Sequence, residues 1–65
     1  MTPRERADKI IEVMKAKKIS QVDLAKDANL NKNTIAIARS GDRSMNTDTL
    51  QRIAKGLGID PKELI

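Results

Sequence analysis

The side chains that could do chemistry in this chain are carboxylates, amines, guanidinium groups and amides, because its 65 residues contain no cysteine and no histidine. The chain therefore lacks thiol nucleophiles, thiolate zinc ligands and the side chain that most often acts as a general base. Asp23 and Asp27 lie about one helical turn apart around Lys26, and we interpret them as surface charges. We expect no catalytic site, no metal site, no cofactor and no enzyme activity.

The composition also restricts the partners that the chain can bind. It has no aromatic residue, so it cannot build the stacking platforms that hold single-stranded nucleic acid or sugar rings. No apolar run approaches the roughly 18 residues of a membrane span, and the charged start around Arg4 and Arg6 is unlike a secretion signal. These features predict one cytoplasmic domain over residues 1–65, with no membrane partner and no small-molecule ligand.

The net charge of +4 favours an anionic partner without requiring one. The basic excess lies toward the N-terminus, since residues 1–18 hold six basic and three acidic side chains, whereas residues 46–65 hold three of each. This gradient is compatible with one end of the molecule facing phosphate. The lysines at 15, 17 and 18 could equally form a solvated helix end that complements the macrodipole.

Start and stop signals divide the chain into five short helices. The first opens with a capping box of Thr2 and Glu5, and Pro3 occupies the first helical position. A left-handed residue, Asn29 or Gly58, is expected to end the second and the fourth. The predicted helices cover residues 3–17, 21–28, 32–40 and 47–57, followed by a last turn that Asp60 caps. No segment alternates with period two, so the predicted fold class is all-α.

Apolar residues at helical spacing give each helix a face for the core. In the second helix this face consists of Val22, Leu24, Ala25 and Ala28. The third helix is short and polar, with Ile35 and Ala38 as its inward positions. Gly56 is expected to weaken the last turn of the fourth helix.

Residues 21–40, QVDLAKDANLNKNTIAIARS, combine two short helices with a tight turn. Two steeply crossing helices need small residues where their backbones meet, here Ala25 and Ala28, and apolar residues that lock the angle, here Leu24, Leu30 and Ile35. This spacing resembles the helix-turn-helix of phage repressor and Cro-like proteins, the XRE family. The resemblance covers nearly the whole chain, from KISQVDLA through NTI to the tail TLQRIAKGLGIDPKELI.

The resemblance implies a compact five-helix fold like that of lambda repressor, with the helix-turn-helix formed by helices 2 and 3. It implies sequence-specific binding of double-stranded DNA by a phage or bacterial transcriptional repressor that occupies a palindromic operator. A protein-interaction module of the same fold, such as the antitoxin of a toxin–antitoxin pair, is the alternative. Salt dependence distinguishes the two, because phosphate contacts weaken steeply with salt and an apolar interface does not.

Three positions depart from the family pattern. Asn29 replaces the glycine common in the turn, which asparagine can replace because it tolerates a left-handed backbone. Many members pair an arginine of helix 1 with a glutamate at the end of helix 3, and this chain has Met14 and Arg39 instead. We expect Met14 to pack as an apolar residue and Arg39 to point to solvent, phosphate or Asp42. Met45 replaces a frequent proline, so the loop before helix 4 is expected to be less fixed.

With its apolar residues facing the core, the third helix carries the candidate base contacts on its opposite side. Asn33 can bond bidentately to adenine N6 and N7, and Lys32 can donate either to guanine or to a phosphate. Ala36 and Ile37 can contact thymine methyl groups. For Ile37, packing against helix 2 or the following loop is a nearly equal alternative.

Phosphate contacts should come from the residues that flank the third helix, because backbone contacts set register. Gln21 is the first candidate, since the N-terminus of a helix favours an anion and the matching glutamine of the family binds phosphate. Asn31 is a second candidate, with helix capping as its safer role. Ser40 and Arg43 could reach the neighbouring backbone or the minor groove, although an arginine in a loop is as often only solvated.

One recognition helix reads only about four to five base pairs, so members of the family bind DNA as two-fold dimers. We expect a homodimer here too, either in free solution or only on DNA. In relatives the contact lies around the end of helix 4 and helix 5, where this chain offers Ile59 and Ile65. In the alternative arrangement, Leu57, Ile59 and Leu64 complete the core and Ile65 alone is exposed.

Overall fold

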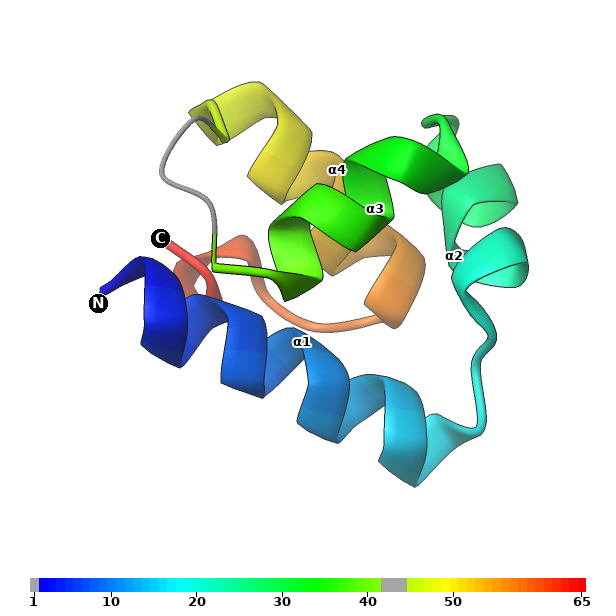
Figure 1. Cartoon of the computed structure of the whole chain (residues 1–65), viewed down its shortest axis with the longest axis horizontal. Helices are drawn as coiled ribbons and strands as arrows, with labels where there is room; N and C mark the ends of the chain where they lie inside the picture. The colour runs from blue at the N-terminus through cyan, green and yellow to red at the C-terminus, as the bar shows by residue number, and fades with distance from the viewer. Residues whose placement is uncertain (1, 42–44) are drawn as a thin grey trace.

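The structure is a computed structural model that describes residues 2–41 and 45–65. Four α-helices are followed by one 3₁₀ turn: α1 (Pro3–Lys17), α2 (Gln21–Ala28), α3 (Lys32–Arg39), α4 (Thr47–Leu57) and η1 (Pro61–Glu63). In Figure 1, α1 runs along the lower side of the molecule, α2 lies at the right edge beyond the end of α1, and α3 runs back through the centre. No strand occurs in the described residues, which confirms the all-α class.

The helices begin where the sequence places capping side chains. Thr2 Oγ1 accepts a hydrogen bond from the Glu5 backbone N–H at 3.1 Å, and Glu5 Oε1 accepts from the Thr2 N–H at 3.4 Å, which completes the predicted capping box. Ser20, Asn31 and Asn46 each accept a backbone N–H at 2.8–3.1 Å. These bonds satisfy N–H groups that have no partner within the helix.

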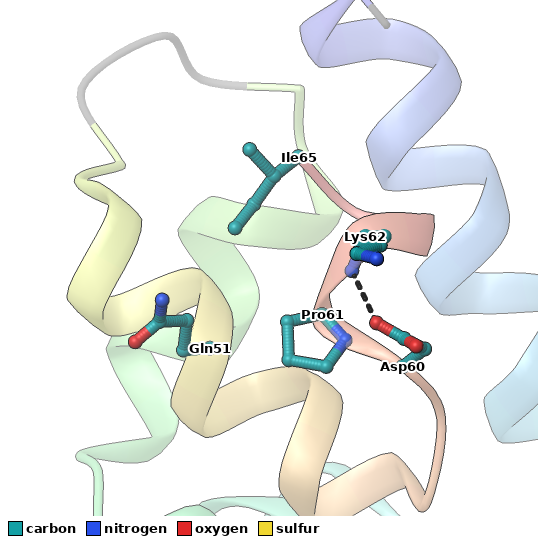
Figure 2. Close-up of a pocket in the computed structure, with 5 residues that line it drawn as sticks. All are labelled: Gln51, Asp60, Pro61, Lys62 and Ile65. Atoms are coloured by element: carbon teal, nitrogen blue, oxygen red, sulfur yellow. Dashed lines mark hydrogen bonds between the residues drawn. The ribbon is translucent and has the colours of Figure 1, made fainter.

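The last of the five predicted helices is a single 3₁₀ turn after Asp60, so the described residues contain four α-helices and not five. The Glu63 N–H donates to the Asp60 carbonyl at 2.9 Å, and the Leu64 N–H donates to the Pro61 carbonyl at 3.0 Å. One turn makes too few bonds to offset the cost of nucleating an α-helix. Asp60 caps this turn as predicted, accepting the Lys62 N–H at 2.9 Å (Figure 2).

Helix α3 ends at Arg39, one residue earlier than predicted. Ser40 is its C-cap, and the serine hydroxyl donates to the Ile37 carbonyl at 2.7 Å. The hydroxyl thus satisfies a carbonyl that would accept a backbone N–H if the helix continued. Gly41 then adopts a left-handed φ of 84°, which redirects the chain away from the helix axis.

The core consists of aliphatic side chains from all four helices and the C-terminal turn. Its fully buried large residues are Ile10, Leu24, Ile35, Ile53, Leu57 and Leu64. The prediction that Val22 belongs to the core face of α2 is wrong, since this side chain is 49% exposed. At 100° per residue, Val22 lies roughly 110° from the centre of the face that Leu24, Ala25 and Ala28 define.

Helices α2 and α4 approach closely at Gly56. A Cβ atom at this position would lie 2.9 Å from Leu24 Cδ1 and 3.4 Å from Ala28 Cβ. Glycine at position 56 is expected to weaken the last turn of α4. Close packing of α2 and α4 compensates for this cost, because a side chain at position 56 would hold the two helices apart.

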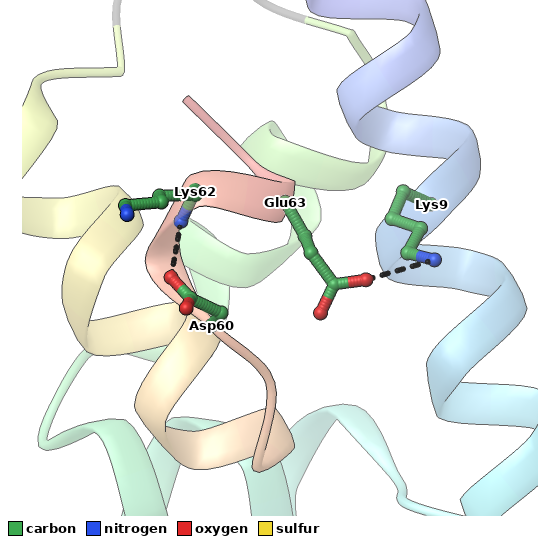
Figure 3. A network of polar contacts seen from close by, with 4 residues as sticks. All are labelled: Lys9, Asp60, Lys62 and Glu63. Atoms are coloured by element: carbon green, nitrogen blue, oxygen red, sulfur yellow. Dashed lines mark hydrogen bonds and ion pairs between the residues drawn. The ribbon is translucent and has the colours of Figure 1, made fainter.

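Two polar contacts tie α1 to the C-terminal part of the chain. Lys17 Nζ donates to the Leu57 carbonyl at 2.6 Å and thereby caps the end of α4. Lys9 Nζ lies 3.3 Å from Glu63 Oε1, so an ion pair links η1 to α1 (Figure 3). Within the described part of the chain, no helix is long and apolar enough to cross a membrane.

Candidate nucleic-acid interface

Helices α2 and α3 are joined by a turn of three residues, 29–31. Asn29 has the predicted left-handed backbone, with φ 56° and ψ 45°. The Leu30 N–H donates back to the Ala25 carbonyl at 2.8 Å, and the Leu30 side chain packs partly buried against the core. Because Ala25 and Ala28 are also buried, small side chains allow the two helices to meet at this corner.

The outer face of α3 is exposed along its whole length. Ile35 is fully buried and Ala38 is 1% exposed, so both point into the core. The opposite side carries the exposed side chains of the predicted base contacts: Lys32, Asn33, Ala36 and Ile37. Ile37 is 40% exposed and therefore does not pack fully against α2. This face offers one ammonium group, one amide and two apolar side chains to a partner.

Gln21 connects the start of α2 to both ends of α3. Its Nε2 donates to the Lys32 carbonyl at 3.0 Å, and its Oε1 accepts from Arg39 Nη1 at 3.2 Å. The sequence suggested solvent, phosphate or Asp42 as the partner of Arg39. The contact with Gln21 is a fourth arrangement, while Asp42 lies outside the described residues. Met14 is 5% exposed in the core, as predicted.

The spacing of residues within α3 is compatible with the bond between Gln21 and Arg39 but does not predict it. Lys32 and Arg39 are seven residues apart, which places them nearly on the same side of an α-helix. A side chain that bonds to the first residue of α3 can therefore also meet a long side chain from the last. The sequence does not show that this side of α3 faces the N-terminus of α2.

The other predicted phosphate contacts have different surroundings. Asn31 Oδ1 accepts the Asn33 backbone N–H at 2.8 Å, so the predicted capping role is present and the amide nitrogen remains at the surface. Ser40 is exposed, but its hydroxyl proton is directed to the Ile37 carbonyl. Arg43 lies outside the described residues.

The charge on α3 is entirely positive. The helix contains Lys32 and Arg39 and no acidic residue, whereas α2 carries Asp23 and Asp27 beside Lys26. An anion therefore meets no repelling carboxylate on α3 itself. Among residues 2–41 and 45–65, no three acidic, histidine or cysteine side chains are grouped so that they could hold a metal ion.

The two predicted dimer residues differ in exposure. Ile65 is 53% exposed, whereas Ile59 is partly buried because it packs against the core. Ile65 borders a hollow of about 490 Å³ between α4 and the C-terminal turn, with Gln51 and Pro61 on its other sides (Figure 2). Leu57 and Leu64 are buried, so they contribute to the core and not to this surface.

Comparisons with known proteins agree with this geometry. The family model of the Cro/C1-type HTH DNA-binding domain matches residues 9–65, which include both helices and the turn. The crystal structure of the restriction-modification controller protein C.AhdI from Aeromonas hydrophila is similar with a TM-score of 0.87 and 25% sequence identity, covering 97% of this chain and 96% of that one. No curated protein sequence matches the chain. The predicted resemblance is confirmed, and the chain belongs to the Cro/C1-type family of helix-turn-helix DNA-binding domains.

Proposed function

We propose that residues 1–65 form one sequence-specific DNA-binding unit that inserts α3 into the major groove and represses transcription. The observation that carries this proposal is the exposed outer face of α3, which has hydrogen-bonding and apolar side chains but no carboxylate. An α-helix fits the major groove, where each base pair presents its own pattern of donors, acceptors and methyl groups. Membership of a DNA-binding family supports a regulator and not an enzyme.

Base recognition would fall to the four exposed residues of α3. The Asn33 amide has both a donor and an acceptor, which match adenine N6 and N7. Lys32 would donate to guanine or to a neighbouring phosphate. Ala36 and Ile37 would contact the methyl groups of thymine, which gives a reason for two apolar side chains on a solvent-facing surface.

The phosphate backbone would be held at both sides of this helix. Gln21 stands at the first position of α2, where the helix dipole favours an anion. Asn31 would donate through its amide nitrogen while its oxygen caps α3. Ser40 and Arg43 follow α3 and complete the proposed set, with Ser40 giving up its bond to Ile37 if it donates to phosphate.

The proposed operator is a palindrome because one α3 reads too few base pairs to define a site. Ile59 and Ile65 are the proposed contact between two copies, formed in solution or on DNA. A protein that covers an operator blocks access to the promoter without any catalysis. The similar fold of a restriction-modification controller protein supports a regulatory role of this kind.

The experiment that tests this proposal is selection from a random pool of duplex DNA, followed by sequencing of the bound fraction. The wild-type chain is compared with Asn33→Ala and with Lys15→Ala, whose exposed side chain lies on α1, each at two salt concentrations. We expect a palindrome with half-sites about ten base pairs apart. Asn33→Ala should relax one position of each half-site and cost about 1–3 kcal/mol in operator binding.

Two outcomes would contradict the proposal. Binding that shows no sequence preference and disappears with salt would reduce the function to electrostatic attachment. Absence of DNA binding would favour the protein-interaction alternative, such as an antitoxin-like module, whose apolar contacts change little with salt. Equal specificity in wild type and Asn33→Ala would remove Asn33 from the recognition surface.

A further inference from the structure

We propose that Arg39 and Gln21 form a two-residue phosphate clamp, in which Arg39 fixes the orientation of the Gln21 amide and itself contacts the DNA backbone. The inference rests on the proposed function, because it assumes that α3 enters the groove. It assigns a role to a residue that departs from the family pattern.

Two hydrogen bonds fix the orientation of the Gln21 amide. Gln21 Nε2 donates to the Lys32 carbonyl at 3.0 Å and Oε1 accepts from Arg39 Nη1 at 3.2 Å. An amide that is free to rotate presents either its oxygen or its nitrogen to a phosphate, and the oxygen would repel the anion. The cationic donor of Arg39 holds the oxygen in place through a charge-assisted bond. The second N–H of Gln21 is then left for a phosphate.

Arg39 has more N–H donors than its contact with Gln21 uses. A guanidinium group has five N–H donors, and among the described residues Arg39 uses them on Gln21 alone. Arg39 is exposed, so the other donors face solvent at the edge of α3 that borders the start of α2. The planar group suits a phosphate, which can take two parallel bonds from it. Gln21 and Arg39 therefore offer neighbouring donors to one anion.

Gln21 and Arg39 differ in charge. Among residues 2–41 and 45–65, no acidic side chain forms an ion pair with Arg39. Gln21 is neutral and cannot release counterions from DNA when it binds a phosphate, whereas Arg39 can. The clamp thus combines one neutral positioning contact with one salt-dependent contact.

The test uses the full chain and a fluorescein-labelled 20-base-pair duplex of arbitrary sequence, with affinity measured by anisotropy between 50 and 200 mM KCl. Arg39→Gln keeps a hydrogen-bonding side chain and removes the charge. The slope of log affinity against log salt should fall by about 0.9 per bound protomer, so the loss of affinity over this salt range should be about 3.5-fold smaller than for wild type. Arg39→Lys should keep the slope but bind more weakly, because an ammonium group lacks the planar fork.

Arg52→Gln is the matched control, since it removes the same charge from an exposed arginine of α4 that pairs with Asp48 at 3.2 Å. It should leave the slope unchanged. Combining Gln21→Ala with Arg39→Gln should cost less than the sum of the two single changes, as expected of residues that act as a unit. Thermal unfolding of each variant shows whether α3 remains in place.

The outcomes separate this inference from the proposed function. If wild type binds the duplex and Arg39→Gln has the same slope with only a lower melting temperature, Arg39 merely attaches α3 to α2 and the inference is wrong. A loss of slope in Arg52→Gln as large as in Arg39→Gln would also overturn it, because a general field would then explain the effect. A wild-type chain that binds no duplex at any salt concentration would overturn the proposed function and this inference with it.

Discussion

Replacing Gly56 by alanine measures how closely α2 and α4 pack. In an exposed helix this change stabilises, because alanine is about 0.8–1.0 kcal/mol more favourable than glycine. Here the new Cβ would lie 2.9 Å from Leu24 Cδ1 and 3.4 Å from both Cβ and N of Ala28. Leu24 is fully buried and cannot move its side chain into solvent, so the contact must be relieved within the packed core, by a shift of Leu24 or of the two helices.

The magnitude follows from two opposing terms. Overpacking of a core by one methyl group costs about 1–3 kcal/mol, which exceeds the gain in helix propensity. We therefore expect Gly56→Ala to lower the free energy of unfolding by about 1 kcal/mol. With a urea m-value near 1 kcal/mol/M, the midpoint should fall by about 1 M. In a domain of this size the melting temperature should fall by about 4–8 °C.

The assay is urea unfolding in two backgrounds, the wild type and Leu24→Val. Valine lacks the Cδ1 atom that meets the new methyl group and should itself cost only about 0.5–1.5 kcal/mol. In the Leu24→Val background, Gly56→Ala should become neutral or stabilising. Its effect on the free energy of unfolding should therefore differ between the two backgrounds by at least about 1 kcal/mol. Stabilisation by Gly56→Ala in both backgrounds would refute the close approach of α2 and α4.

Three further changes test other contacts. Lys18 has a left-handed backbone with φ 55°, so Lys18→Gly should raise the free energy of unfolding by about 1 kcal/mol. A lower free energy of unfolding, measured with urea, would contradict this. Lys17→Met removes the donor to the Leu57 carbonyl and should lower the melting temperature by about 4–8 °C, whereas an unchanged value would assign no stability to this bond. Ile65→Lys should reduce self-association in sedimentation and weaken operator binding at least about tenfold, and the dimer proposal fails if neither changes.

The helix starts could be predicted because each depends on a few neighbouring residues. A cap joins a side chain to a backbone N–H only two or three residues away, as at Thr2, Ser20, Asn31 and Asn46. The left-handed backbone of Asn29 could be predicted for the same reason, because it depends on the residue type at the end of one helix. The last turn was overestimated because the same cap signal precedes an α-helix and a 3₁₀ turn, and only the number of bonds that follow distinguishes them.

The contacts that join distant segments could not be predicted from the sequence. Lys17 and Leu57 are 40 residues apart, and Gln21 and Arg39 are 18 apart. Such pairs depend on the crossing angles of helices, which a single sequence does not specify. The exposure of Val22 has a similar cause, because an apolar residue at the edge of a helix face is buried only if a neighbouring element covers that edge.

The exposed face of α3, which we propose contacts bases, could be predicted only in part. Helical periodicity predicted which side would be exposed, since Ile35 and Ala38 leave only one orientation for a short amphipathic helix. The roles of Asn33 and Ile37 at that surface depend on a DNA partner. The selection experiment therefore tests them more directly than any property of the free chain.

The replacement of the family's usual charged pair by Met14 and Arg39 changes how α3 is held. A buried arginine at position 14 would need an acidic partner on α3, whereas the thioether of Met14 packs among aliphatic side chains and needs none. At position 14 the packing of α1 is therefore apolar, and Arg39 donates to Gln21 at the start of α2. Burial of apolar surface depends weakly on salt, while a cation at the edge of the proposed groove-binding face increases the salt dependence of DNA binding. The apolar packing of Met14 is thus distinct from the charge of Arg39 that we propose contacts the DNA backbone.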